Sequence, residues 1–551
     1  MSRLLLLALV TPWLVAAATL ALGGRRRLVE ATAVGGGLVL LAAVAGLVSP
    51  ALAGEAPALP PVPFVAGVEF AFRADAAAVF FAGVVATLWP VASVYSSGYL
   101  RATNAGSGTR FFAAFAASIG SVVGIAFAAN LLALFVFYEL LTVATYPLVV
   151  HAETETARRA ARKYAAYALT GGVAVLAGTV LVYATAGTVA FTPGGVEGVV
   201  AADPVLARAA FALLVAGFGV KAALMPLHGW LPDAMVAPTP VSGLLHAVAV
   251  VKSGVFGVGR VVLYVFGPDG VAAMGAGLPL AAVAAATMLL AGLLALRQDR
   301  LKRGLAYSTV SQLSYIVLGF AVLTPTAVRG AVLHLSTHAF MKLALFFCAG
   351  IVYAETHVER IDELDGIARR LPLTMALFAV ASAGLVGLPL VAGFVSKWYL
   401  LAGLFGGGHL LLGGALALAG LLKLLFFWPV LANALPAAAS ADRSAGTLRA
   451  DGGRGGEGGD EGRGGDDHHG TDDHHAADDH HAADDHHGTN DHHAGAPGDG
   501  GWEARTWRTE TDWRLVAPVA VAVLVTVAYG VVPAELPFFD LAARVVEVTT
   551  G

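Results

Sequence analysis

The sequence predicts an all-α membrane protein of about fourteen transmembrane helices, and three observations lead to this fold class. Of the 551 residues, 57% are hydrophobic and only 13% are charged, whereas a soluble domain usually carries about 25% charged residues. The mean hydropathy is +0.73. The 66 glycines suit helices packed closely in a bilayer, where small residues let backbones approach. This composition excludes a soluble enzyme.

Each predicted span follows from the rule that about 20 apolar residues cross the hydrocarbon core of a bilayer. The division of the fourth and fifth spans at Asn130 rests on length, because no strong polar break separates them, and thirteen or fifteen spans also fit. The first span is expected to be a membrane helix or signal anchor, since further apolar segments follow it. The rule places spans at 4–22, 28–49, 76–98, 111–129, 130–150, 164–184, 207–227, 242–266, 273–296, 304–323, 328–353, 373–401, 408–434 and 514–533.

Loop charges orient these spans, because Lys and Arg concentrate in short cytoplasmic loops. With fourteen spans and both termini outside, the other side of the membrane shows only scattered arginines. The cytoplasmic loops then hold the clusters Arg25 to Arg27, Arg101 and Arg110, Arg158 to Lys163, Arg297 to Arg303, and Arg360 to Arg370.

Helix-breaking residues interrupt two of the predicted spans. The seventh span and its continuation read LMPLHGWLPDAMVAPTPVSG, and the twelfth contains GLVGLPLVAGFVSKW. Irregular backbone at membrane depth is tolerated only where protein or water satisfies the freed amides. One break falls in each of two five-helix blocks, as in transporters built from inverted repeats with discontinuous helices. The predicted divisions are helices 1 to 3 over 1–110, repeats over 111–266 and 273–435, an acidic loop over 436–512, and the last helix with its tail over 513–551.

The loop after the thirteenth span is strongly acidic. Residues 441–512 hold 18 acidic and 6 basic residues, a net charge of −12, and the tract DDHHGTDDHHAADDHHAADDHHGTNDHH contains ten of the 17 histidines. Such a polymer cannot bury a core, so we expect a disordered cytoplasmic linker. Metal binding at His468, His469, His474 and His475, or proton buffering, is the alternative, since imidazoles and carboxylates are competent ligands. The single cysteine, Cys348, excludes disulfides and multi-thiolate metal sites within the chain.

Ionisable residues inside apolar spans are the strongest functional signal. Each costs about 2.5–3.5 kcal/mol on insertion scales and therefore demands a compensating reason. Lys397 and Lys423 could extend to the interface if they lie near helix ends, but a short carboxylate such as Glu139 cannot. The candidate residues are Glu139, Lys221, His246, Lys252, His334, His338, Lys342, Lys397 and Lys423.

His334, His338 and Lys342 are spaced i, i+4, i+8, which places them along one stripe of a helix. The stripe predicts a water-facing row. A metal clamp or a hydrogen-bonded core pair are alternatives for the two histidines, although no third metal ligand is near them in sequence. Such a row suits proton hopping, because burial lowers the pKa of lysine and raises that of glutamate, whereas a close opposite charge reverses both shifts. Histidine, which titrates near neutrality, relays between such groups.

Three segments resemble a known family. KAALMPLHGWLPDAMVAPTPVSGLLHAVAVVKSGVFGVGR, DRLKRGLAYSTVSQLSYIVLG and HLSTHAFMKLALFFCAG closely resemble the antiporter-like subunits shared by Mrp-type cation/proton antiporters and the proton-pumping arm of respiratory complex I. The resemblance covers about residues 70–435 and implies fourteen helices with inverted five-helix repeats. The Asp/His loop is an insertion that the family pattern does not require.

The resemblance also implies roles for individual residues. Glu139 is similar to the family's fifth-helix glutamate, Lys221 to its paired seventh-helix lysine, and Lys252 to the eighth-helix connecting lysine. His246 fits a supporting position. The central relay corresponds to His334, His338 and Lys342, and the terminal station to Lys397.

The resemblance to the D subunit of Mrp antiporters rests on WPVASVYSSGYLR, on Lys397 and on the lack of a long helix after the last span. The expected function is therefore proton translocation within a multisubunit Na+/H+ antiporter of the cell membrane. The alternative is an M-like pumping subunit of complex I or of a membrane-bound hydrogenase, and a scaffold with relic charges is the third. Partner subunits, protons, Na+ and lipid are expected. We expect no nucleic acid, no catalytic residue in the isolated chain, and no cofactor or resident metal.

Overall fold

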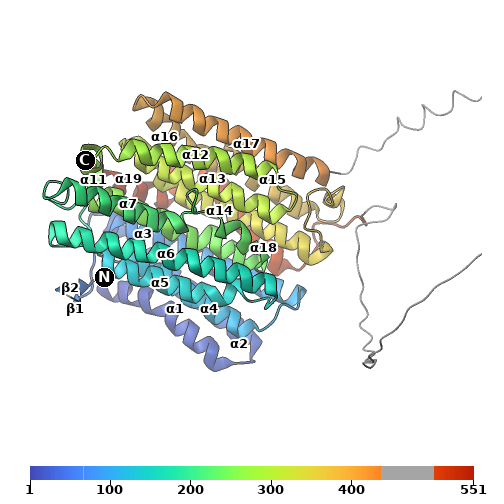
Figure 1. The fold of residues 1–551 in the computed structure, drawn as a ribbon. Coiled ribbons are helices and arrows are strands. Elements are labelled where there is room, and N and C mark those ends of the chain that lie inside the picture. Colours follow the sequence, from blue (N-terminus) through green and yellow to red (C-terminus); the bar gives the residue numbers. More distant parts are fainter. Residues whose placement is uncertain (66, 436–501, 551) are drawn as a thin grey trace, which may run out of the picture.

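A computed structural model of the chain describes residues 1–65, 67–435 and 502–550. Figure 1 shows a bundle of long helices that run side by side, with α1 near one edge and α17 near the opposite edge. The N- and C-terminal ends marked there lie at the same end of the bundle as the small hairpin. The described end of α17 lies at the other end.

The first part of the chain forms three long helices and one hairpin. Asp75 begins the third helix, because its side chain accepts a hydrogen bond from the Ala78 amide at 2.8 Å and satisfies a free donor of the first turn. The antiparallel hairpin pairs Val62 with Phe70 and was not expected from the sequence. The elements are α1 (Ser2–Leu22), α2 (Arg26–Leu52), β1 (Val62–Val65), β2 (Val68–Phe70) and α3 (Ala76–Ala102).

The next helices confirm the expected division at Asn130. The Asn130 side chain accepts a hydrogen bond from the Ala133 amide at 2.8 Å and so caps a new helix. Thr154 and Asp203 cap the following two helices in the same way. The helices are α4 (Gly108–Phe127), α5 (Leu131–Val149), α6 (Glu155–Ala186) and α7 (Pro204–Lys221).

After α7 the helical path is broken, as Pro226, Pro232 and Pro238 predicted. Two short helical pieces follow, and the next span contains π-helical turns on both sides of a regular segment. The pieces are α8 (Trp230–Asp233), η1 (Ala234–Val236), α9 (Thr239–Gly243), η2 (Leu244–Val248), α10 (Val250–Arg260), η3 (Val261–Val265) and α11 (Gly267–Ala273).

The second half of the bundle contains the other predicted break. Gly387 has a left-handed φ of 97° and ends one half-helix, and Val391 precedes the next half. The elements are α12 (Gly277–Leu296), α13 (Leu301–Ala321), α14 (Pro325–Thr356), η4 (Ile367–Arg369), α15 (Pro372–Val386), α16 (Ala392–Gly406) and α17 (Leu410–Ala434).

The described chain resumes at Trp502 and packs against the bundle before the last span. The Gly366 amide donates to the carbonyl of Asn433 at 2.8 Å, and Trp502 Nε1 donates to the neighbouring Asp365 carbonyl at 2.9 Å. The final elements are α18 (Trp513–Val531), η5 (Pro533–Glu535) and α19 (Pro537–Thr550).

The predicted class of multi-pass all-α membrane protein is confirmed. Twelve helices in the described ranges are long and apolar enough to cross a membrane. The two remaining predicted spans, 304–323 and 373–401, correspond to α13 and to the pair α15 and α16. α14 lies near the centre, since it contacts α13, α15, α16 and α18, and the central part of this long apolar helix is fully buried.

Candidate proton pathway

The ionisable residues expected inside the spans are enclosed by the bundle. We call Lys221, His246, Lys252, His334, His338, Lys342 and Lys397 the buried row. Lys397 is 7% exposed and all the others are fully buried. Because none of them lies on an outer face of the bundle, their charges must be handled by neighbouring protein groups or water.

Glu139 lies at one end of this arrangement, on α5. It is partly buried, and its Oε1 atom has no hydrogen-bond partner within the described chain. Gly172 of α6 leaves room for the carboxylate, because a Cβ at this glycine would collide with Oε1. A buried carboxylate oxygen without a partner is costly unless it takes up a proton, water or a cation. This oxygen is therefore a candidate proton-binding position.

Lys221 is the last residue of α7, directly before the break. Its Nζ atom donates to the Tyr138 carbonyl and lies 3.4 Å from the centre of the Tyr138 ring. In the described ranges, no hydrogen bond joins Lys221 to Glu139, although Glu139 follows Tyr138 directly. The ammonium of Lys221 is therefore bound to the backbone of the residue before Glu139, and not to the Glu139 carboxylate with which the family resemblance pairs it.

Gly254 brings α10 against the broken end of α7. A Cβ at Gly254 would collide with the backbone of Lys221 and Ala222. Lys252 lies two residues earlier on α10, so the glycine brings the two lysine-bearing backbones together. No hydrogen bond connects the two ammonium groups in the described structure. Proton exchange between them would require water or side-chain movement.

His246 lies in the π-helical turn η2. Both of its ring nitrogens are buried without a hydrogen-bond partner in the described chain, and its ring lies 4.6 Å from that of Phe346. π-helical turns inside longer helices frequently occur at functional sites. Within the described chain, His246 is therefore a member of the buried row that no hydrogen bond of its side chain connects to the other members.

Lys252 of α10 is in direct contact with His338 of α14, and this contact joins the two halves of the chain within the buried row. Lys252 Nζ and His338 Nδ1 are 2.6 Å apart, and the rings of His338 and His334 are 5.9 Å apart. Among the described residues, His338 Nε2 is buried without a partner. The spacing i, i+4 does align the two histidines, and the row continues from α10 onto α14.

Gln312 and Ser396 extend the row from His334 to Lys397. His334 Nε2 lies 2.7 Å from Gln312 Oε1, and His334 Nδ1 lies 2.9 Å from Ser396 Oγ. Gln312 Nε2 donates to the Leu385 carbonyl at 3.2 Å. Lys397 Nζ donates to the same carbonyl at 2.5 Å. The end of half-helix α15 therefore joins the relay to its last lysine.

Lys342 and Lys423 are held by hydroxyl groups of α13. Lys342 Nζ donates to Ser308 Oγ and, at 2.8 Å, to the Leu305 carbonyl. Lys423 donates to Ser311 Oγ and is fully buried. This burial shows that Lys423 does not extend to an interface, so it belongs with the candidate residues. The signal that could have identified Ser308, Ser311 and Gln312 is the polar face of YSTVSQLSY.

A cavity of about 850 Å³ opens at the end of the bundle where α6 and α13 begin. Its lining includes Arg159, Lys163, Asp233, Lys302 and Glu359. Lys163 pairs with Asp233 at 2.6 Å, and Lys302 donates to the Ala237 carbonyl at 2.9 Å. The cavity offers water a polar approach to the broken segment between α7 and α10.

The described ranges contain no group of three or more His, Cys, Asp or Glu side chains that could hold a metal ion. His334 and His338 instead contact glutamine, serine and lysine side chains. The alternative metal ligands His468, His469, His474 and His475 lie outside the described residues.

The fold and the site define a multi-pass membrane protein built around a buried row of ionisable side chains. The chain belongs to the NADH:quinone oxidoreductase/Mrp antiporter transmembrane family, whose family model matches residues 128–422.

Two curated relatives illustrate the breadth of the family. Subunit N of the NADH-quinone oxidoreductase of Desulforudis audaxviator (strain MP104C) is 35% identical over 355 residues, which are 64% of this chain and 70% of that protein. The A/B polypeptide of a probable K(+)/H(+) antiporter of Rhizobium meliloti (strain 1021) is 34% identical over 333 residues, which are 60% of this chain but only 32% of that protein.

Solved structures of two membrane complexes share the fold. A chain of the Mrp complex from Dietzia sp. DQ12-45-1b matches with a TM-score of 0.76 and 21% identity, covering 100% of this chain and 99% of that chain. A chain of the archaeal membrane-bound sulfane sulfur reductase matches with a TM-score of 0.74 and 20% identity, covering 99% and 97%.

Proposed function

We propose that this chain is the proton-translocating subunit of a multisubunit Na+/H+ antiporter, most similar in its sequence signals to an Mrp D subunit. The observation that carries the proposal is the run of contacts from Lys252 through His338, His334 and Gln312 to Lys397. Groups that bind protons with different affinities, placed close to one another in the interior of the bundle, can pass protons stepwise.

Glu139 and Lys221 form the control point at the start of the path. In the structure Lys221 is bound to the Tyr138 carbonyl, and Glu139 Oε1 has no partner within the described chain. A small rotation that brings the ammonium to the carboxylate would strengthen proton binding on lysine and weaken it on glutamate. Making and breaking this pair would therefore change the proton affinity of both residues in opposite directions.

The chain would work within a larger assembly in the cell membrane. Curated relatives are named as subunits of NADH-quinone oxidoreductases and of a probable K(+)/H(+) antiporter. The clustered basic loops favour both termini outside and the acidic loop in the cytoplasm. This orientation is compatible with Figure 1, where both termini lie at one end of the bundle and the described end of α17 lies at the other. The division into five-helix repeats over 111–266 and 273–435 is part of the proposal. It is supported by the helix breaks after α7 and after α15, because one break falls in each proposed repeat.

A pumping subunit of a respiratory complex is the second candidate. It is favoured by the 35% identity to a subunit N over 70% of that protein's length. The two functions differ in their energy source. An antiporter subunit exchanges cations for protons without a reductant, whereas a respiratory pump requires electron transfer.

Dye quenching in everted vesicles from antiporter-deficient cells tests the proposal, with the chain produced in its complete assembly. Addition of Na+ should reverse a respiration-generated acid gradient. Lys221→Ala and Glu139→Ala should abolish this response while the assembly is still recovered intact. Full Na+-dependent exchange in either variant would refute the assigned roles. Proton movement that requires NADH and quinone and does not depend on Na+ would favour the pumping subunit of a respiratory complex.

A further inference from the structure

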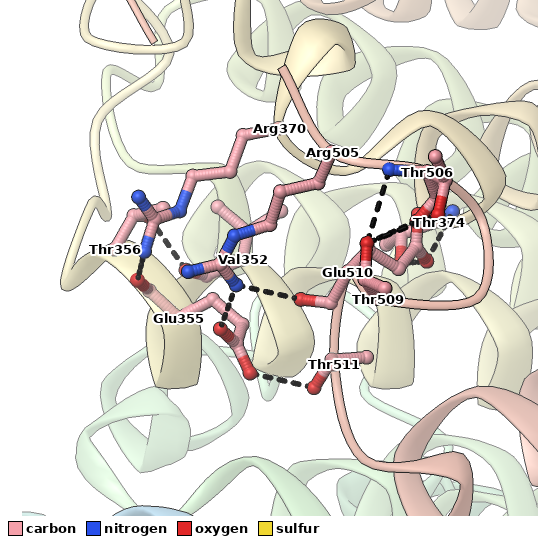
Figure 2. A network of polar contacts seen from close by, with 10 residues as sticks. All are labelled: Val352, Glu355, Thr356, Arg370, Thr374, Arg505, Thr506, Thr509, Glu510 and Thr511. Carbon is pink, nitrogen blue, oxygen red and sulfur yellow. Dashed lines mark hydrogen bonds and ion pairs between the residues drawn. The ribbon is translucent and has the colours of Figure 1, made fainter. Parts of the chain in front are cut away.

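The segment Trp502–Asp512 ties the last span to the ends of α14 and α15 (Figure 2). Arg505 Nη1 donates to Glu355 Oε2 at 3.2 Å, and Thr511 Oγ1 donates to Glu355 Oε1 at 2.6 Å. We call this segment the tie. Its contacts lie outside the candidate proton pathway, and neither the family resemblance nor the sequence pattern assigns it a role.

Glu510 of the tie acts as the N-terminal cap of α15. Its carboxylate accepts hydrogen bonds from the amide of Thr374 at 3.0 Å and the Thr374 hydroxyl at 2.7 Å (Figure 2). It also accepts one from the amide of Leu373 at 2.8 Å. Leu371 occupies the usual cap position and has no side chain that could accept these bonds. A helix needs such acceptors, because its first amides have no partner within the helix. Here the acceptor comes from a residue 136 positions further along the chain than Thr374.

The other end of α15 holds Lys397. Lys397 Nζ donates to the carbonyls of Leu385 at 2.5 Å and Val386 at 2.8 Å, which are the last two residues of α15. The first of these carbonyls also accepts the hydrogen bond from Gln312. A helix of 15 residues is a stiff rod of about 22 Å. A displacement of its first turn therefore moves the carbonyls that hold the lysine.

We propose that Glu510 is a positioning residue for proton transfer: by capping α15 it fixes the carbonyls of Leu385 and Val386 against the ammonium of Lys397. The inference rests on the proposed function. Glu510 does not carry a proton in this scheme. Its effect reaches Lys397 only through the placement of the half-helix.

The surroundings of both residues are compatible with this indirect role. Within the described chain, Arg505 contacts the backbone carbonyl of Glu510 at 3.1 Å, and the carboxylate that faces Glu510 is that of Glu355. The titratable or charged groups that face Lys397 are Tyr315 of α13, His334 of α14 and Lys423 of α17.

The test uses the full chain in its assembled complex and three variants. Glu510→Ala removes the acceptor, Glu510→Gln keeps one carbonyl oxygen, and Thr511→Val is the control, because it removes a hydrogen bond of the tie to Glu355 but leaves the cap. Amide hydrogen exchange is measured in the first turn of α15 and around residues 386–391. Na+-dependent proton exchange per complex is measured as a function of pH.

Glu510→Ala should speed exchange in both regions at least about tenfold. It should also move the midpoint of the transport profile to lower pH by about one unit, since an ammonium that loses carbonyl acceptors gives up its proton more readily. Glu510→Gln should keep the amide exchange rates and the midpoint of the transport profile close to those of the unmodified chain. Thr511→Val should leave both unchanged.

The inference is overturned if Glu510→Ala leaves the exchange around residues 386–391 or the transport profile unchanged. It is also overturned if Thr511→Val produces the same shift as Glu510→Ala, because general loosening of the tie would then be the cause. Failure of the proposed function is distinguishable, since the unmodified complex would show no Na+-dependent exchange at any pH.

Discussion

The ammonium of Lys252 and Nδ1 of His338 lie 2.6 Å apart although the two residues are 86 positions apart in the chain. Both side chains are fully buried, and they belong to the two halves that we propose to be repeats. A proton on this pair can reside on either partner. The contact is therefore where the relay would cross from one half of the chain to the other.

Removing the lysine of this pair should stop transport. Lys252→Met keeps most of the side-chain volume but carries no proton, so Na+-dependent proton exchange should fall at least about a hundredfold, as for other losses of a proton-transfer group. The measurement is dye dequenching, normalised to the amount of assembled complex. Arg162→Gln is the matched control, because this exposed cation pairs with the exposed Glu155. Near-normal exchange in Lys252→Met would show that protons bypass the pair.

The space around Glu139 gives a second prediction. Gly172→Ala introduces a methyl group where Glu139 Oε1 lies, so the carboxylate must move and exchange should slow by about tenfold. Gly414→Ala adds the same methyl group on α17, where no atom of another described element lies within 4 Å. Equal rates in the two variants would mean that the position of the Glu139 carboxylate does not limit transport.

Gln312 should matter for both stability and transport. Gln312→Leu leaves His334 Nε2 without its partner at 2.7 Å, and a buried polar group that loses its partner costs about 1–3 kcal/mol. The variant should melt at lower temperature in detergent and exchange protons more slowly. Gln298→Leu removes an amide that bonds to the carbonyl of Leu294 in the preceding helical turn, and it should melt normally.

The pair of Asp75 and Arg260 predicts an effect on stability. Arg260 is 1% exposed and donates two hydrogen bonds of 2.8 Å to the Asp75 carboxylate. Arg260→Gln leaves that carboxylate with only the longer contact to Arg73 at 3.9 Å and should destabilise the bundle by about 3 kcal/mol. Adding Asp75→Asn should recover part of the loss. Arg110→Gln breaks an exposed pair and should cost less than about 1 kcal/mol.

Glu510 lies outside the spans and predicts a pH dependence. Burial raises the pKa of its carboxyl above the ordinary value of 4.5. Because the folded protein binds this proton more tightly than the unfolded chain, the associated stability is present below pH 4.5 and is lost as pH rises through the raised pKa. The melting temperature of the wild type relative to Glu510→Gln should therefore fall across this interval and then level off. A constant difference at all pH values would contradict the assignment.

The sequence predicted those features whose signals are local. The breaks at Pro226 and at Gly387 and the start of a helix after Asn130 depend on residues within a few positions. The i, i+4 spacing of His334 and His338 aligned them correctly, because a single helix carries both. Burial of Lys423 was left open, since a lysine in an apolar run can reach either the interior or the interface.

The features that the sequence could not predict depend on contacts between distant segments. Gln312 joins His334 to Leu385, and no residue near Gln312 in the sequence indicates either of these partners. Glu510 caps α15 across 136 positions, and the only local trace is the absence of a capping side chain at Leu371. The distance between Lys221 and Glu139 likewise depends on how α5 and α7 pack, which periodicity does not determine.

Asn433 and Trp502 are hydrogen-bonded to two adjacent residues of the bundle: Asn433 to Gly366, and Trp502 to Asp365. This arrangement affects how the length of the chain between them can vary during evolution. The described ends of the chain on either side of residues 436–501 are therefore held at neighbouring points of the bundle. Residues can be inserted or deleted between those two attachments without altering the distance that the intervening stretch must span. The number of Asp/His units in the sequence can therefore change while the two attachment points of the described chain keep their places.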